Sequence, residues 1–422
     1  MAKLAVGRLV SEVGSRITRE GLPVAAILAA SASTTELGLL ATLSMLPALV
    51  LGTGAGVLVD RSRRRPLLIA ADVVRALLLF TVPAAALAGR LTFAQIAVVT
   101  TLVAAVTVLF QVADRAYLPS LAGRDRLAEA NGVLASADAV GESVGPALMG
   151  VLVQAFGVPA AIVGDALSYV VSAISLTAIR RSEPAPGAAP AYGQDAPVRS
   201  GRAPQLLDGL AAVARHPTLR PLAGLVATTA LFGGFFSALY EFYVLRTLGL
   251  APAVLGLLIT CGGVGSLIGA ALSARFARRF GIGRVLVATF AVSALATMLV
   301  PAAGGRFAPA FLFLFAAQFG GDLFATVFTI ASATLEQTVT PSAWLGRVEG
   351  ALQTLSGGLG VVGALGAGAL GAAIGPRDAF WLAALGNAAA TGWLLSPRLR
   401  RLDQPDAQAI AWPGAAGAAA GP

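Results

Sequence analysis

The sequence has little charge, one cysteine and one histidine. Only 12% of its 422 residues are charged and 57% are hydrophobic, with a mean hydropathy of +0.80, whereas about 25% of residues are charged in an average soluble domain. This composition excludes an ordinary water-soluble domain. Cys261 alone cannot form an internal disulfide, and with His216 alone it cannot form a Cys/His metal cluster. We therefore expect no metal and no other cofactor.

Two catalytic signatures are also missing. The sequence contains no HExxH and no P-loop GxxxxGK, so we expect no enzyme and no ATP hydrolysis by this chain. A cleavable signal peptide is excluded because Arg16, Arg19 and Glu20 interrupt the first apolar run, and we expect the first helix to be retained. A membrane-embedded scaffold or enzyme is the alternative from another functional class.

Long apolar segments account for most of the chain. A helix needs about 20 apolar residues to cross a bilayer, so this length accommodates about twelve spans. The pattern predicts an all-α membrane protein with twelve transmembrane helices, near residues 8–31, 36–59, 66–88, 92–118, 129–156, 158–179, 219–245, 253–274, 283–303, 308–335, 345–373 and 378–396.

A Pro-, Ala- and Gly-rich stretch divides these helices into two sets of six. We predict an N-terminal six-helix bundle over residues 1–181 and a C-terminal one over 218–400. The segment between them, 182–217, is predicted to be a cytoplasmic linker that ends in an amphipathic helix on the membrane surface, Gln205 to Arg215. The Ala/Gly/Pro-rich residues 401–422 are predicted to be a disordered cytoplasmic tail.

The basic residues predict the orientation. If successive connections alternate between the two sides, 22 of the 30 Lys and Arg fall on one side and four on the other. Cytoplasmic loops carry the excess of Lys and Arg, so both termini should be cytoplasmic in a multi-pass protein of the plasma (inner) membrane. The formal net charge of +9 thus belongs to loops next to the lipid bilayer, and we expect no nucleic acid partner.

The two halves resemble each other at a fixed offset in the sequence. Four glycines of the first half recur at this offset: Gly132, Gly145, Gly150 and Gly157 match Gly350, Gly363, Gly368 and Gly375. The pattern favours two repeats of the same orientation with a substrate path between them near the middle of the membrane.

A distinctive string joins the second and third helices. Gly56 lies one helical turn before Asp60, which is followed by a basic run that includes Arg61, Arg64 and Arg65. A small residue allows close helix contact, and a carboxylate at a helix end can bind a neighbouring helix terminus or an arginine. We interpret the string as a cytoplasmic gate; the alternative is an ordinary basic loop.

The fifth helix carries a second pattern, consisting of Gly132, Gly141, Gly145, Pro146 and Gly150. Glycines at these spacings give a smooth face for close packing, and the proline removes a backbone donor. An ordinary glycine-rich membrane helix is the alternative interpretation.

Both patterns resemble signatures of the major facilitator superfamily. The loop string is similar to its gating loop, and Arg63, in place of a second glycine, is similar to the branch of macrolide-efflux and enterobactin-exporter proteins. The fifth helix is similar to the antiporter motif, with Met149 in place of one glycine. The resemblance implies two six-helix bundles, transport by alternating access and a monomer.

Several ionisable residues fall inside predicted spans, where each costs about 2.5–3.5 kcal/mol at the helix centre and needs a partner or a cavity. Five are candidates for proton coupling or substrate binding, namely Arg19, Glu20, Asp138, Glu142 and Asp322. Asp138 and Glu142 share one helical face, where two like charges favour a proton carrier. Alternatively, Glu142 pairs with an arginine such as Arg19 and only holds the bundle together.

Together these features predict a proton antiporter that exports a lipophilic or amphiphilic small molecule, such as a drug, a macrolide or a siderophore. An uptake symporter or lysophospholipid flippase of the same fold is the alternative. Five aromatic residues of the seventh helix either line an apolar cavity or simply pack: Phe232, Phe235, Phe236, Tyr240 and Tyr243.

Overall fold

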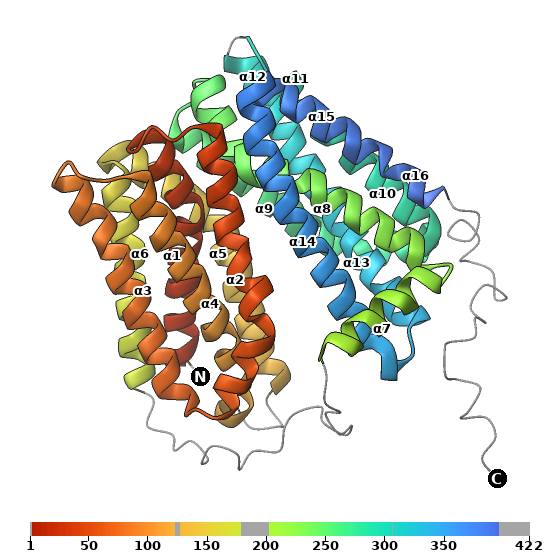
Figure 1. Ribbon diagram of the computed structural model, residues 1–422, viewed down its shortest axis with the longest axis horizontal. Coiled ribbons are helices and arrows are strands. Elements are labelled where there is room, and N and C mark those ends of the chain that lie inside the picture. Colours follow the sequence, from red (N-terminus) through yellow and green to blue (C-terminus); the bar gives the residue numbers. More distant parts are fainter. Residues whose placement is uncertain (1, 123–126, 179–201, 306, 396–422) are drawn as a thin grey trace. The chain divides into compact units, whose positions relative to one another are not determined.

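A computed structural model describes residues 2–122, 127–178, 202–305 and 307–395, and within these ranges all regular elements are helices (Figure 1). Six helices form the first half, at the positions that the apolar pattern predicts. They are α1 (Ala2–Leu28), α2 (Thr34–Asp60), α3 (Arg64–Leu87), α4 (Phe93–Ala122), α5 (Leu127–Phe156) and α6 (Val158–Thr177).

The second half has more breaks than the sequence suggests. Its elements are α7 (Arg202–Arg215), α8 (Leu219–Phe242), the π-helix η2 (Tyr243–Thr247), α9 (Pro252–Phe280), α10 (Ile282–Thr297), α11 (Leu299–Ala302), α12 (Phe307–Phe315), the π-helix η3 (Ala316–Gly320), α13 (Gly321–Val339), α14 (Ser342–Ile374), α15 (Pro376–Ala389) and α16 (Thr391–Leu394). The predicted amphipathic segment is the helix α7. The predicted linker is described only from residue 202, and the predicted tail, 401–422, lies outside the described residues.

Ten helical stretches in the described ranges are long and apolar enough to cross a membrane. The first and the last of the twelve predicted spans are not among these ten. Helix α1 carries four charged residues close together, Glu12, Arg16, Arg19 and Glu20, and they lower its hydropathy. The last predicted span is divided at Ala390 into α15 and α16, each too short to cross by itself.

The helices pack into two compact units. Unit 1 contains α1 to α6 together with the segments Ala238–Gly263 and Ala367–Pro376. Within it α1 packs against α5 and α6, α3 against α4 and α6, and α2 against α4. Unit 2 contains α7 and the first part of α8, the segment Val264–Gly366, and α15 with α16; α10 packs against α13 there, around a core that includes Leu219, Leu286 and Val327.

Glycine contacts recur at the same offset that relates the two halves of the sequence. In unit 1, a Cβ added to Gly145 would lie 3.2 Å from the carbonyl oxygen of Val13. In unit 2, a Cβ on Gly363 would collide with the carbonyl oxygen of Leu231. Gly363 is the repeat counterpart of Gly145, and Leu231 is that of Val13. In both helix pairs, α5 with α1 and α14 with α8, a glycine therefore faces a backbone carbonyl, and the approach of α14 to α8 is the closer one.

A second pair of glycine contacts, both within unit 1, is also related by the offset between the two halves. A Cβ on Gly150 would lie 3.2 Å from the Cα of Gly256, and a Cβ on Gly368 would lie 3.1 Å from the Cα of Gly38. Gly368 is the repeat counterpart of Gly150, and Gly256 is that of Gly38. The glycines thus place α5 against α9 and α14 against α2 at backbone contact, which larger side chains would prevent.

Candidate functional site

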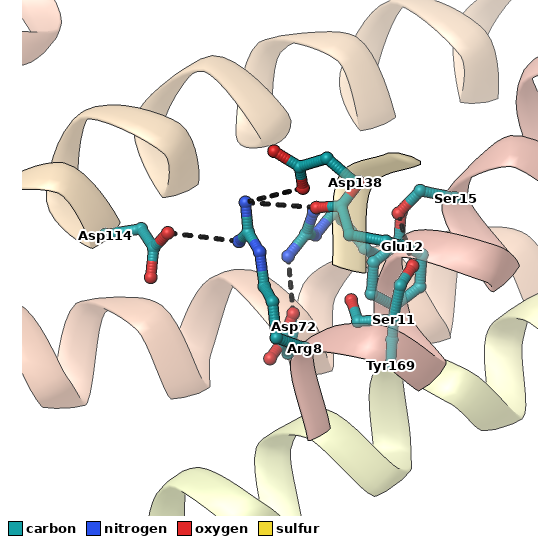
Figure 2. Close-up of polar contacts among 9 residues, drawn as sticks. Arg8, Ser11, Glu12, Ser15, Asp72, Asp114, Asp138 and Tyr169 are labelled. Atoms are coloured by element: carbon teal, nitrogen blue, oxygen red, sulfur yellow. Dashed lines mark hydrogen bonds and ion pairs between the residues drawn. The ribbon is translucent and has the colours of Figure 1, made fainter. Parts of the chain in front are cut away.

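A group of charged side chains lies inside unit 1, centred on Arg8 of α1 (Figure 2). The guanidinium lies 3.0 Å from Glu12 Oε1, one turn along the same helix, and 3.1 Å from Asp114 Oδ2 on α4. It also lies 3.9 Å from Asp138 Oδ1 on α5. One arginine thereby links three helices. Asp138, a candidate from the sequence, is a partner of this arginine.

Arg75 of α3 forms the second centre of the group. It pairs with Asp72 one turn earlier, and both side chains are almost completely buried, with exposed fractions of 2% and 0%. Its guanidinium lies 4.2 Å from the ring centres of both Phe110 and Tyr169. Tyr169 in turn shares a hydrogen bond of 3.0 Å with Ser15 of α1. The two aromatic rings and the Asp72 carboxylate therefore hold the guanidinium of Arg75 in place.

Asp165 of α6 is buried next to this arrangement. Its Oδ1 accepts a hydrogen bond of 2.9 Å from Ser168, and Thr18 of α1 also contacts its carboxyl group. Gly14 of α1 leaves room for both side chains, because a Cβ there would collide with them. The core of unit 1 therefore holds two buried aspartates close to one buried arginine.

A separate charged group lies further along α1. Arg16 Nη1 donates a hydrogen bond of 3.2 Å to Glu142 Oε1 on α5, and Arg19 lies nearby. The predicted structural pairing of Glu142 is thus found, with Arg16 as its partner. The carboxyl group of Glu20 is hydrogen-bonded to that of Glu241 on α8, also in unit 1. Our sequence analysis missed Glu241, although a lone carboxylate in an apolar helix was a sufficient signal.

The predicted gate residues lie around the turn from α2 to α3. Asp60 is the exposed last residue of α2 and forms no ion pair with any residue that the structure describes, and a Cβ on Gly56 would contact nothing within 4 Å. Arg65 donates hydrogen bonds of 3.0 and 2.8 Å to the carbonyl oxygens of Leu176 and Thr177. This arginine therefore satisfies free carbonyls at the end of α6 and ties α3 to it.

The other two basic gate residues flank the turn. Arg61 is the exposed C-cap of α2, and Arg64 is the first residue of α3. The structure thus brings the gate residues together at one turn.

The glycines of α5 have different surroundings. Gly141 and Gly145 face α1, and a Cβ on Gly141 would lie 3.0 Å from the Cβ of Glu12. The carbonyl oxygen of Pro146 faces Gly256 of α9, as Gly150 does. A Cβ on Gly132 would meet nothing within 4 Å. Four of the five motif positions therefore allow two helices to approach α5.

The remaining candidates are mostly packed. Asp322 is half-buried at the second position of α13, directly after η3. The ring of Phe236 lies 5.0 Å from that of Phe380, and a Cβ on Gly386 would collide with the ring of Phe232. Phe235, Tyr240 and Tyr243 are buried. This aromatic face therefore has packing partners in the structure.

One string in α5 matches a hydrolase pattern by spacing alone. Residues 141–145 read Gly-Glu-Ser-Val-Gly, but a nucleophilic serine in this pattern sits on a strand-to-helix turn. Ser143 lies inside α5 and donates a hydrogen bond of 2.9 Å to the carbonyl oxygen of Ala139. His216 instead accepts hydrogen bonds of 3.3 Å from the N–H groups of Thr218 and Leu219 at the start of α8. No serine–histidine arrangement is built from these residues.

Comparison with known proteins assigns the chain to a family. The model of the Major Facilitator Superfamily matches residues 9–245, more than half of the chain. The chain belongs to the Major Facilitator Superfamily. Its members are transporters, and the helical architecture above is that of a multi-pass membrane protein of this superfamily.

Two superfamily relatives match most of the chain. The multidrug efflux pump Tap of Mycolicibacterium fortuitum is 28% identical over 415 residues, which cover 94% of this chain and 95% of that protein. The MFS-type transporter YfiS of Bacillus subtilis strain 168, itself uncharacterised, is 28% identical over 365 residues, covering 83% and 81%.

Solved structures of similar fold are also transporters. A bacterial homologue of the iron transporter ferroportin in an inward-facing state superposes with a TM-score of 0.73 at 15% identity, covering 93% of this chain and 97% of that one. The nucleoside transporter NupG gives a TM-score of 0.70 at 14% identity, with 93% and 98% covered. At these identities the likeness concerns the fold alone.

Proposed function

We propose that this superfamily transporter exports a lipophilic or amphiphilic small molecule in exchange for protons. The observation that carries the proposal is the match with a protein named a multidrug efflux pump, because it extends over nearly the whole length of both chains. The glycine pattern of α5, similar to the antiporter motif, also favours export. The resemblance to the macrolide-efflux and enterobactin-exporter branch narrows the substrate class to drugs, macrolides or siderophore-like molecules.

The intramembrane carboxyl groups support coupling to protons. A charged side chain inside a span costs about 2.5–3.5 kcal/mol on insertion scales, so such residues are usually retained for function or paired. Unit 1 contains Glu20, Asp138, Glu142 and Glu241 on three helices, while the described part of the chain has no group of three His, Cys, Asp or Glu that could hold a metal ion. A proton is the simplest ion that such carboxyl groups can carry.

Alternating access is the proposed mechanism. Two six-helix bundles, 1–181 and 218–400, would move against each other as a monomer, with both termini in the cytoplasm. Asp60 would act as a cytoplasmic latch that binds a neighbouring helix end in one conformation and releases it in the other. Uptake or lysophospholipid flipping by the same fold is the second candidate function, but no described contact favours it over export.

The proposal is tested by efflux from cells. Cells that lack or express the protein are loaded with ethidium, tetraphenylphosphonium or erythromycin, and retention is followed with and without a protonophore. Expression should lower retention of at least one probe, and the protonophore should abolish the difference. Asp60→Asn should reduce efflux at least tenfold at normal membrane abundance. Equal retention of every probe with and without expression would refute the proposal.

A further inference from the structure

Glu20 of α1 and Glu241 of α8 form a carboxyl–carboxyl contact. The two side chains are hydrogen-bonded to each other, and Glu241 is only 9% exposed. An ionised carboxylate only accepts hydrogen bonds, so two ionised carboxylates cannot form one between them. For the two groups to attract and not repel each other, one of them must carry a proton.

The charges around the contact lead to the same requirement. The groups that face Glu20 are Arg16 and Arg19 from its own helix, Glu142 from α5 and Glu241 from α8. Three carboxyl groups thus share two guanidinium groups, and Arg16 is already paired with Glu142 at 3.2 Å. The arginines leave one carboxyl group without a compensating charge. Since an unpaired charge is expensive in a membrane protein, a proton completes the balance.

The contact also joins two helices at a point where α8 changes its winding. The π-helix η2 begins at Tyr243, two residues after Glu241, and such π turns are frequent at functional sites. From η2, Arg246 donates a hydrogen bond of 2.7 Å to the carbonyl oxygen of Ile27. Glu20 and Ile27 lie about 10 Å apart along α1 at 1.5 Å per residue. The carboxyl pair and Arg246 are therefore two separate links between α1 and the α8–η2 segment.

We infer that Glu20 and Glu241 together form the proton-binding site of the transporter, and that the bound proton holds α1 against α8. This inference rests on the proposed proton antiport. When the proton leaves, two carboxylates remain in contact, and their repulsion separates the helices. A proton gradient would thereby act directly on the packing of two helices that belong to different halves of the sequence.

The other carboxyl candidates are less suited to this role. Asp138 has a 49% exposed side chain and lies beside Arg8, and Glu142 is 57% exposed and paired with Arg16. Both side chains are far more exposed than Glu241, and the partner of each is an arginine and not another carboxyl group. The Glu20–Glu241 pair differs because its members contact each other.

The first test measures coupling in proteoliposomes with ethidium as the probe. The parent chain should accumulate ethidium when a pH gradient is applied. Glu20→Gln/Glu241→Gln keeps the size and hydrogen bonding of both side chains but cannot release a proton, so gradient-driven accumulation should fall at least tenfold. The matched control is Glu336→Gln/Glu349→Gln, which removes another hydrogen-bonded carboxyl pair, in unit 2, and should accumulate ethidium as the parent does. Normal coupling in the first double variant would overturn the inference.

The second test does not depend on knowing the substrate. Spin labels are placed on Leu28→Cys in α1 and Thr247→Cys at the end of η2, both exposed, in a Cys261→Ser background. The distance between the labels should increase as the pH is raised, and the increase should be absent when Glu20→Gln/Glu241→Gln is added. A distance that does not change with pH, or that changes equally in the glutamine variant, would overturn the inference. If no probe is transported by the parent, the proposed function fails, whereas this measurement still decides on the proton site.

Discussion

Replacing Arg75 by leucine should strongly destabilise unit 1. The side chain of Arg75 is 2% exposed, pairs with the fully buried Asp72, and lies between the rings of Phe110 and Tyr169. Leucine fills part of the space but leaves the Asp72 carboxylate without a counter-charge. The loss therefore comes mainly from an uncompensated buried charge and only secondarily from lost stacking.

The size of the effect can be worked from these contacts. Breaking a buried ion pair by removing one partner costs about 3–5 kcal/mol, and each ring contact of a desolvated cation contributes roughly 1–2 kcal/mol. Leucine regains part of the ring contact, so we expect a loss of about 4 kcal/mol in the free energy of unfolding. For a unit of this size, the melting midpoint should fall by roughly 8–16 °C.

The double variant Asp72→Leu/Arg75→Leu separates charge from packing. Replacing both members of a buried pair by apolar residues is often nearly neutral, so the double variant should melt within about 4 °C of the parent. Arg75→Lys keeps the charge but loses the planar stacking, and should fall between the parent and Arg75→Leu.

The chain offers a natural probe for this measurement. Cys261 is its only cysteine and lies in unit 1, so a thiol-reactive fluorescent dye reports when that unit opens. The tryptophans among the described residues, Trp344, Trp381 and Trp393, lie in unit 2, so their fluorescence follows that unit separately. Arg75→Leu should shift the dye transition more than the tryptophan transition. A parent-like dye transition, or a double variant no more stable than Arg75→Leu, would refute the reasoning.

Three further predictions concern single contacts. Gly150→Leu should block the approach of α9 to α5 and reduce efflux at least tenfold. The control is Gly132→Leu, which should leave efflux near the parent level because a Cβ at Gly132 meets nothing within 4 Å. Equal effects of the two variants would reject the packing role of Gly150. Arg65→Ala removes two hydrogen bonds to the end of α6 and should lower the stability of unit 1 by about 1–3 kcal/mol in the dye assay. Glu142→Gln breaks a half-exposed pair with Arg16 and should cost less than about 1 kcal/mol while preserving proton-driven accumulation; loss of coupling in this variant would reassign the proton site to Glu142.

The predicted helices agree with the structure mainly because each must contain a long apolar run. Where the runs are broken, the agreement is weaker. The last predicted span is divided at Ala390, and π-helices interrupt the runs that follow Phe242 and Phe315. Such breaks depend on how each turn packs against its neighbours, and apolar periodicity does not record this.

The candidate site was predicted less completely than the fold. Asp138 and Glu142 were assigned to one helical face, but their arginines, Arg8 and Arg16, could only be identified once α1 was placed against α5. Glu241 was overlooked although a lone carboxylate in an apolar helix was a sufficient signal, and only its pairing with Glu20, in the other half of the sequence, was beyond prediction. Pairing between distant helices requires tertiary coordinates.

The sequence by itself determined that the chain is a helical membrane protein, and it predicted two similar halves. The length of each apolar run follows from the thickness of the bilayer. The offset between the halves follows from glycines that recur at a constant spacing. Only the tertiary structure decided which glycines touch, that Gly150 meets Gly256 while Gly368 meets Gly38, and that Glu20 meets Glu241. The physical reason is that a membrane helix can satisfy its backbone alone, whereas a buried charge needs a partner from another helix.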